Sequence, residues 1–245
     1  MSEILFVGTS DAFGAGGRRQ SAVLFRAPSG TLLIDCGATT CGGLQALGVE
    51  RDEIDAIVVS HFHGDHFGGI PHILLAAIYQ DERTRPLVIA GPPDIESRVW
   101  ALARALGHDL ESREFPFALE FREIPPGSVQ SIGPARITSF ETKHQLESHP
   151  HGYDIRCGGQ RVVYSGDTGW FDDLPRLSAG ADLFICECTH HSKQLDYHLN
   201  YQTLCERQRE FDCGRIFLTH RSEEMLGRSD TASFELADDG MSVHL

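Results

Sequence analysis

Residues 58–69 read Val-Val-Ser-His-Phe-His-Gly-Asp-His-Phe-Gly-Gly and place three imidazoles and one carboxylate within six positions. An apolar run typical of a buried strand precedes these side chains, and a helical pattern follows them. Imidazole nitrogen suits zinc and neighbouring first-row metals, and a carboxylate adds an oxygen ligand. His61 and His63 can point the same way from an extended turn, while Asp65 and His66 can face a second point. One short loop therefore predicts ligands for two metal sites.

Two sites need more ligands than this loop offers, because a catalytic zinc usually takes three protein ligands and leaves a position for water. Three more polar residues each follow a predicted strand, namely His144, Asp167 and His220. In open α/β architectures, functional groups gather at one edge of the sheet, outside the strand ends. The four strand ends therefore predict one cleft, and their seven potential ligands favour metal binding over packing.

Other histidines compete for these roles. His149 and His151 follow His144 closely, so one of them could replace it, but we favour His144 because it is nearest the preceding strand. Two more face the same end of the cleft and could touch substrate, although a solvated loop explains them equally well: His190 and His191. Three solitary histidines are interpreted as ordinary core or surface residues: His72, His108 and His244.

The His-x-His-x-Asp-His segment, with the later histidines and Gly166-Asp167-Thr168, resembles the five-part signature of the metallo-β-lactamase superfamily. More narrowly, the chain resembles the ribonuclease Z-like and phosphodiesterase branch. Segments from the first strand onward carry this likeness: Gly8-Thr9-Ser10 with Arg18, Leu33-Ile34-Asp35-Cys36-Gly37, Gly68-Gly69-Ile70-Pro71, Ala90-Gly91-Pro92-Pro93, Gly152-Tyr153-Asp154-Ile155-Arg156, Glu187-Cys188-Thr189 and His198-Leu199. The resemblance implies an α/β fold, a four-layer αββα sandwich, as a single domain over residues 1–245.

The resemblance also implies a dinuclear centre between the sheets. It assigns His61, His63 and His144 to the first metal, and Asp65, His66 and His220 to the second, with Asp167 bridging both. Asp35 matches the family's first motif, whose carboxylate accepts a hydrogen bond from a ligand imidazole and fixes its tautomer. The expected cofactors are two divalent ions, zinc first, with manganese or iron as alternatives.

Such a centre suits hydrolysis of a phosphodiester or of an activated carbonyl. The Gly-Pro-Pro, Glu-x-Thr and His198 features favour a phosphodiesterase, with Asp65 and His198 as catalytic residues and His198 as proton donor to the leaving oxygen. Residues 199–201, Leu-Asn-Tyr, depart from the branch pattern after this histidine. The alternatives are a lactone, ester or thioester hydrolase using the same centre, and a non-catalytic metal-stabilised binding module. A redox di-iron relative is disfavoured, because that pattern usually places Glu at position 63 and brings a flavin partner.

The net charge of the chain restricts the size of the anionic substrate that we expect. Acidic residues number 35 and basic residues 21, so the formal net charge is -14 and the pI is near 5.3. This balance disfavours non-specific binding to nucleic acid or to an anionic membrane. Ribonuclease Z proteins grip transfer RNA with a long basic, glycine-rich arm, whereas residues 90–137 here are short and not basic. We therefore expect a small or cyclic anionic substrate; a homodimer is expected only by analogy with the branch.

The chain has no apolar run near the roughly 18 to 20 residues of a membrane helix. Its first ten residues lack the basic region of a secretory signal. The seven cysteines are an odd number without a C-x-x-C pair, which is typical of reduced core residues. These features predict a cytoplasmic protein without membrane attachment.

Short apolar runs bounded by turn residues predict strands at 4–7, 22–25, 32–34, 56–59, 87–90, 137–140, 162–164, 183–186 and 216–218. Helical spacing predicts helices at 67–79, 94–106 and 201–211. Pro125-Pro126-Gly127 is expected to separate two structural halves, and an Asp-Gly turn predicts a final hairpin of 233–236 with 241–244 at a sheet edge. The glycine-rich residues 8–17 precede a strand where a dinucleotide-binding loop needs a helix, so we expect them to line the cleft instead.

Overall fold

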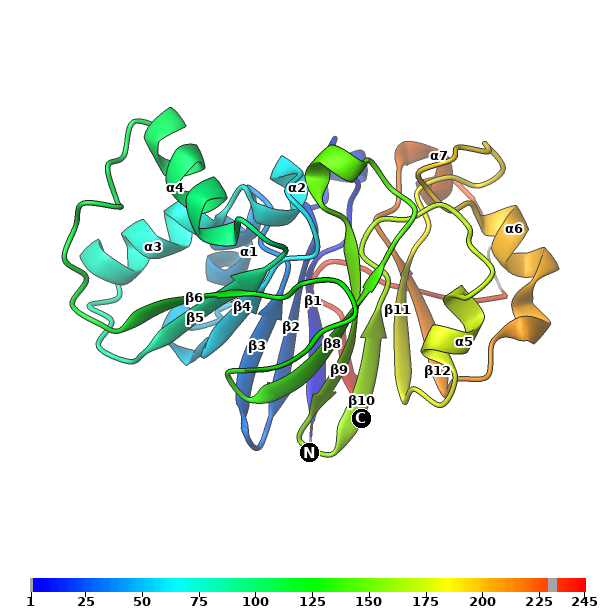
Figure 1. Cartoon of the computed structure of the whole chain (residues 1–245). Coiled ribbons are helices and arrows are strands. Elements are labelled where there is room, and N and C mark those ends of the chain that lie inside the picture. Colours follow the sequence, from blue (N-terminus) through cyan, green and yellow to red (C-terminus); the bar gives the residue numbers. More distant parts are fainter. Residues whose placement is uncertain (1, 229–232) are drawn as a thin grey trace.

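Two β-sheets packed face to face form the centre of the molecule, and helices cover the outer face of each (Figure 1). The computed structural model describes residues 2–228 and 233–245. Within these residues each sheet has seven strands, in the orders β14-β1-β2-β3-β4-β5-β6 and β13-β12-β11-β10-β9-β8-β7. This arrangement confirms the predicted four-layer αββα sandwich.

The two sheets are built from strands of two to seven residues. The first sheet contains β1 (Glu3–Gly8), β2 (Ala22–Ala27), β3 (Gly30–Ile34), β4 (Ala56–Val58), β5 (Leu87–Gly91), β6 (Leu119–Glu123) and β14 (Ser242–His244). The second contains β7 (Val129–Ile132), β8 (Ala135–Glu141), β9 (His151–Cys157), β10 (Gln160–Tyr164), β11 (Leu183–Glu187), β12 (Arg215–Thr219) and β13 (Glu235–Leu236). The α-helices are α1 (Thr40–Ala46), α2 (Gly64–Phe67), α3 (Ile70–Tyr79), α4 (Ile95–Ala105), α5 (Leu174–Ser178), α6 (Tyr201–Glu206) and α7 (Glu223–Leu226). Short 3-10 turns lie at Ala15–Gly17, Arg51–Glu53, Leu146–Ser148 and Gln208–Glu210.

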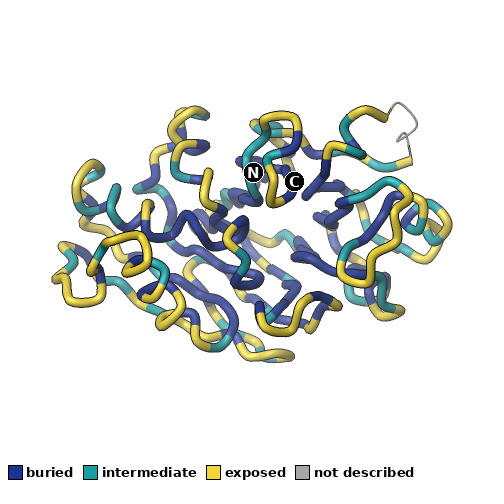
Figure 2. Tube along the Cα trace, turned by 90° about the horizontal axis from the view of Figure 1, so that it is seen from above, coloured by how far each residue is buried: buried dark blue, intermediate teal, exposed yellow. Residues whose placement is uncertain are grey.

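The central strands are buried on both faces. In β1, Ile4 and Phe6 belong to the apolar cluster between the sheets, whereas Leu5 and Val7 belong to the cluster beneath the helices of the first sheet. A strand covered on both sides reads as a continuous apolar run rather than an alternating one. Figure 2 shows the consequence from above, with buried chain through the middle of the molecule and exposed chain around it.

All nine predicted strands are present, with ends shifted by at most two residues. The strands β6, β7 and β9 are not among these nine. In β6 and β7, exposed and half-buried polar residues interrupt the apolar pattern by which a strand is predicted. The predicted helix at 67–79 corresponds to α3, which begins at Ile70, while Phe67 ends a separate short helix, α2, that begins at Gly64. The predicted helix at 94–106 is α4. The predicted helix at 201–211 stops at residue 206 and continues as a short 3-10 turn.

The predicted C-terminal hairpin is wrong. β13 pairs in parallel with β12 in the second sheet, whereas β14 pairs antiparallel with β1 in the first. The turn between them crosses from one sheet to the other because Asp239 anchors it elsewhere: its carboxylate accepts hydrogen bonds from the backbone N–H groups of Thr9 and Arg19 at 2.9 and 2.7 Å. The Asp-Gly pair therefore marks a turn without joining two paired strands.

Residues 125–127 lie between β6 and β7, where the chain passes from the first sheet to the second, which confirms the predicted division into halves. β3 to β6 run parallel to one another, and so do β10 to β13. Their carboxyl ends therefore gather at sheet edges that can carry functional groups. Among the described residues, no helix is long and apolar enough to cross a membrane.

Candidate metal centre

The side chains that follow four strand ends meet in one place. His61 and His63 follow β4, Asp65 and His66 lie on α2, and His144, Asp167 and His220 follow β8, β10 and β12. Ligand atoms of these seven residues form two groups, in each of which all atoms lie within 4.8 Å of one another. The predicted convergence of the seven residues is therefore present in the structure. We call the two groups the imidazole half (His61, His63 and His144) and the carboxylate half (Asp65, His66, Asp167 and His220).

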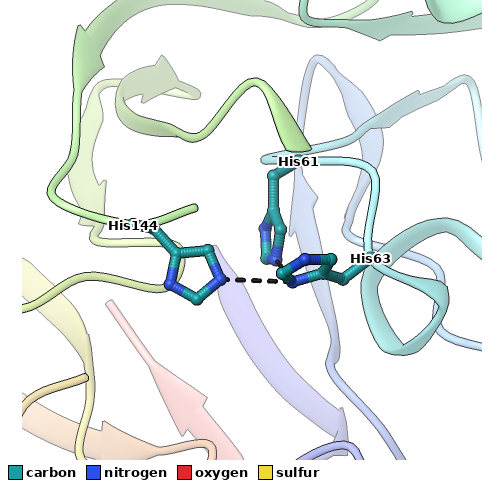
Figure 3. Close-up of side chains that lie close together, drawn as sticks. All are labelled: His61, His63 and His144. Carbon is teal, nitrogen blue, oxygen red and sulfur yellow. Dashed lines mark hydrogen bonds between the residues drawn. The ribbon is translucent and has the colours of Figure 1, made fainter. Parts of the chain in front are cut away.

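In the imidazole half, three ring nitrogens face a common point (Figure 3). His63 Nδ1 lies 3.1 Å from His61 Nε2 and 3.2 Å from His144 Nε2. The outer nitrogens of two rings are already engaged: His61 Nδ1 lies 3.0 Å from Ser60 Oγ, and His144 Nδ1 lies 2.9 Å from the backbone carbonyl of Tyr197. Because a carbonyl only accepts, His144 carries its hydrogen on Nδ1 and presents a lone pair at Nε2.

The carboxylate half is more deeply buried and more strongly charged. His66 Nε2 lies 3.4 Å from Asp65 and 3.3 Å from Asp167, while His220 Nε2 lies 3.2 and 3.4 Å from the same two carboxylates. Asp167 also approaches the imidazole half, with 3.8 Å between its Oδ2 and His61 Nε2. Its carboxylate therefore lies between the two groups.

These residues fit divalent cations. His66 Nε2 and Asp167 Oδ1 are buried without a hydrogen-bond partner, which is costly unless a ligand or ion occupies the space between them. Burial lowers the pKa of His61 well below its usual range, so its ring is neutral and offers a lone pair. Burial opposes ionisation of Asp65, but the neighbouring His66 and His220 hold the pKa of its carboxyl well below the usual range. The neutral ring of His61 and the ionised carboxylate of Asp65 are in the protonation states that a metal ligand needs.

Asp35 orients the ring of His66. Its Oδ2 accepts hydrogen bonds from His66 Nδ1 at 2.7 Å, from Ser60 Oγ at 2.8 Å and from the Tyr164 hydroxyl at 2.6 Å. The Asp35 backbone adopts a left-handed φ of 59°, which turns the side chain beneath the loop after β4. Asp35 thus lies where the sequence placed it. Ser60 and Tyr164 were missed, because neither carries a motif and their contacts appear only in the folded chain.

A second buried carboxylate, Glu187, holds His198 directly and His220 through Thr189. Glu187, at the end of β11, accepts hydrogen bonds from His198 Nδ1 and from the Thr189 hydroxyl, both at 2.9 Å. Thr189 Oγ1 in turn accepts from His220 Nδ1 at 2.9 Å. Burial lowers the pKa of His198, but the carboxylates of Glu187 and Asp167 outweigh it and raise this pKa to about 9. Glu187 and Thr189 belong to the Glu-x-Thr segment of the family resemblance, which by itself assigns no role to either residue.

The competing histidines lie apart from the two groups. His151 donates from Nδ1 to the carbonyl of His149 at 2.8 Å and stacks on Tyr153, and neither His149 nor His151 belongs to a metal-type group in the described part of the chain. His190 lines the cleft and pairs with Glu224 at 3.2 Å. His191 stacks on Tyr201.

A cleft of about 860 Å³ opens above the centre. Its floor includes His63, Asp65 and Asp167, and its walls come from the 189–198 segment, the start of α7 and the glycine-rich loop after β1. That loop contributes Asp11, Ala12, Phe13 and Ala15, which confirms that it lines the cleft. His198 lies in the wall beside the cluster, so a molecule in the cleft can touch both.

Comparison with known proteins gives consistent matches. The family model described as "Anti-Pycsar protein Apyc1" matches residues 2–240. A ribonuclease Z of Mycobacterium bovis is 29% identical and is matched over 76% of this chain and 69% of its own length. The metallo-β-lactamase fold protein YhfI of Bacillus subtilis superposes with a TM-score of 0.79 at 25% identity, covering 100% of both chains. The short form of human tRNase Z gives a TM-score of 0.80 at 24% identity, covering 99% of this chain and 98% of its own.

The family match spans nearly the whole chain, and the curated relative and both solved structures agree with the ribonuclease Z-like fold. The cluster of histidine and aspartate side chains could hold metal ions. The chain is therefore a metal-dependent hydrolase of the ribonuclease Z-like metallo-β-lactamase superfamily, and it belongs to the anti-Pycsar protein Apyc1 family.

Proposed function

We propose that the chain hydrolyses a small or cyclic phosphodiester with two divalent metal ions, zinc first among the candidates. The observation that carries this proposal is the position of His198, which a buried carboxylate holds beside the metal-type cluster and in the wall of the cleft. A centre without such a donor would suit any activated ester equally well.

The ligand assignment follows the two groups. His61, His63 and His144 would hold one ion, and Asp65, His66 and His220 the other, while Asp167 reaches both. Two such ions supply Lewis acidity and bring the pKa of water toward about 7. Asp35, hydrogen-bonded to His66, keeps that ring in the tautomer that presents Nε2 to the ion.

His198 and Asp65 handle the protons. Glu187 occupies Nδ1 of His198, so Nε2 is the nitrogen left to face a substrate, and His198 delivers its proton to the departing oxygen. An alkoxide leaving from phosphorus benefits from such a donor because negative charge builds on it as the bond breaks. Asp65 lines the cleft as well, and its carboxylate would accept a hydrogen bond from the attacking water.

Charges around the cleft support a small substrate. Among the lining residues, Lys193 is the sole lysine or arginine, whereas Asp11, Glu223 and Glu224 are acidic. Residues 91–137 contain seven acidic and five basic side chains, so this segment offers no basic surface to a long polyanion. A small anion reaching two cations in the cleft avoids this repulsion.

The proposal extends to a single domain over residues 1–245 and to a cytoplasmic protein. Two seven-stranded sheets sharing one apolar interior support one domain. The free state of all seven cysteines is what a reducing compartment favours.

The test is turnover of bis-p-nitrophenyl phosphate and of 2',3'- and 3',5'-cyclic nucleotides by zinc, manganese and iron forms, compared with a lactone panel. We expect phosphodiester hydrolysis, and a loss of kcat of about 100-fold in His198→Ala with retained metal content. The loss should be smaller for bis-p-nitrophenyl phosphate, because p-nitrophenolate leaves without needing a proton.

A matched control is His72→Ala, which removes an exposed imidazole of α3 outside the cleft and should leave turnover unchanged. Hydrolysis of lactones with no phosphodiester turnover in any metal form would replace the proposal with the carbon-ester alternative. Equal losses of His198→Ala on good and poor leaving groups would remove His198 from the role of proton donor.

A further inference from the structure

The mouth of the cleft carries an aromatic side chain that the proposed chemistry does not use. Phe13, in the glycine-rich loop after β1, lines the cleft and is 92% exposed, more than any other large apolar side chain among the described residues. A single exposed apolar residue is ordinary on a protein surface, so exposure alone assigns no role. Two further features distinguish Phe13: hydrogen bonds fix the loop that carries it, and a second apolar residue, Leu195, lines the same cleft.

The loop holds Phe13 in a defined place. Asp11 Oδ1 accepts hydrogen bonds from the backbone N–H of Phe13 at 3.1 Å and of Ala15 at 3.4 Å. The N–H of Gly16 donates to Glu223 at 2.6 Å, which ties the loop to the start of α7. Gly14 and Gly16 adopt left-handed φ values of 73° and 63°, which glycine accepts without strain. Phe13 is therefore displayed by an ordered turn, and a ligand that contacts it need not order the loop first.

Within this loop, Ala15 is buried whereas Phe13 is exposed. Ala15, two positions later, is 3% exposed, while the phenyl ring of Phe13 remains in solvent. Leu195, 39% exposed, lines the cleft from the segment that also carries His198. The two segments rise from the same edge of the sandwich (Figure 1). The mouth thus offers apolar surface on two walls above a polar floor.

We propose that Phe13 is a specificity-determining residue that stacks on a flat aromatic ring of the substrate while the phosphodiester lies over the metal-type cluster. This inference rests on the proposed function for the position of the phosphate. A phenyl face offers no hydrogen bond, so it selects for a ring as such and tolerates different ring substituents. Leu195 adds apolar surface from the other wall.

The test compares two ligands that differ only in the ring. Adenosine 5'-monophosphate and ribose 5-phosphate share the sugar and the phosphate, so the ratio of their dissociation constants for the zinc-loaded protein, measured by calorimetry, reports the ring contact. We expect the wild type to favour the ring-bearing ligand by about 5- to 100-fold. Phe13→Ala should bring the ratio close to one, and Phe13→Trp should restore it.

Leu146→Ala is the matched control. Leu146 is also highly exposed, at 80%, but it is not among the residues that line the cleft, so its removal should leave the ratio unchanged. In turnover, Phe13→Ala should raise KM for cyclic nucleotides more than it lowers kcat.

A wild-type ratio near one, or the same ratio in wild type and Phe13→Ala, overturns the inference even if phosphodiesters are hydrolysed. A ring preference that depends on Phe13 in a protein without phosphodiester turnover supports the ring contact and removes the proposed function. The two ideas therefore fail separately.

Discussion

The imidazole half and the carboxylate half of the centre hold their ligands by different means. In the imidazole half, His61 Nδ1 contacts the Ser60 hydroxyl, and His144 Nδ1 donates a hydrogen bond to the backbone carbonyl of Tyr197. In the carboxylate half, Asp35 contacts His66 directly, and Glu187 reaches His220 through Thr189. The imidazole half is thus in direct contact with a hydroxyl and a backbone carbonyl, whereas in the carboxylate half a carboxylate contacts one of the two rings directly.

This difference bears on how strongly each half attracts a cation. The carboxylate half contains two ligand carboxylates and has two more behind its histidines, whereas the imidazole half shares Asp167 and reaches Asp35 only through the Ser60 hydroxyl. Negative charge close to a buried cation strengthens its binding and raises the basicity of the ligand imidazoles. We therefore expect a chelator to remove the ion of the imidazole half first.

The largest expected effect comes from Asp167→Asn, because this carboxylate is the one that both halves share. We expect hydrolysis to fall by more than about 100-fold, with loss of at least one of the two proposed metal ions. Activity assays and elemental metal analysis measure the two effects. Asp172→Asn, at an exposed position five residues later, is the control. Full metal content and activity in Asp167→Asn would contradict a shared carboxylate.

Asp35→Asn should have an intermediate effect, larger on the carboxylate half, because Asp35 contacts His66 directly and His61 only through the Ser60 hydroxyl. Asn offers one acceptor oxygen, whereas Asp35 accepts from the Ser60 N–H and hydroxyl, His66 and Tyr164, so donors lose their partner. We expect about 10- to 100-fold weaker binding of one metal ion and a loss of about 1–3 kcal/mol in the free energy of unfolding. Metal titration and urea unfolding measure these quantities.

Asp55→Asn separates the two effects of the previous substitution. Asp55 accepts from the Thr31 N–H at 2.8 Å, remote from the centre, so its replacement should reduce stability while leaving metal affinity unchanged. If Asp35→Asn behaved in the same way as Asp55→Asn, Asp35 would be structural only.

The smallest effects are expected from two substitutions, one at a side chain that holds His220 and one at a residue whose backbone holds His144. Thr189→Val removes the hydroxyl between His220 and Glu187, and we expect metal binding to weaken by about 10-fold. Tyr197→Ala keeps the carbonyl that accepts from His144, so the affinity of the imidazole half should stay the same. Metal titrations of both variants test this contrast; a large loss in Tyr197→Ala would mean that the Tyr197 ring, not its carbonyl, positions His144.

The seven clustered side chains and the strands before them could be predicted because both signals are local. The apolar run before His61 and the polar residues after it occupy neighbouring positions, so the strand and the ligands are read from one window. The predicted run at 183–186 likewise became β11, whose end places Glu187 beside the centre. The helix at 94–106 was predicted for the same reason, since its apolar face repeats at helical spacing.

The groups that support the ligands could not be predicted in this way. Tyr164 and Asp35 are 129 positions apart, and Thr189 and His220 are 31 apart, yet each pair shares a hydrogen bond. The C-terminal turn shows the same limit, because the carboxylate of Asp239 finds its donors 220 and 230 positions away and so directs β14 to the first sheet. Local turn chemistry carries no information about such partners.

The sequence by itself determined which polar residues follow the strand ends and the acidic balance that disfavours a long polyanion, and its family resemblance implied the αββα class. Only the tertiary structure decided which groups orient those ligands, which sheet receives each C-terminal strand, and that Phe13 is exposed in the wall of the cleft. The reason is physical. Periodicity and turn propensity act between neighbouring residues, whereas hydrogen bonds and cleft walls depend on distances that exist only after the two sheets have packed.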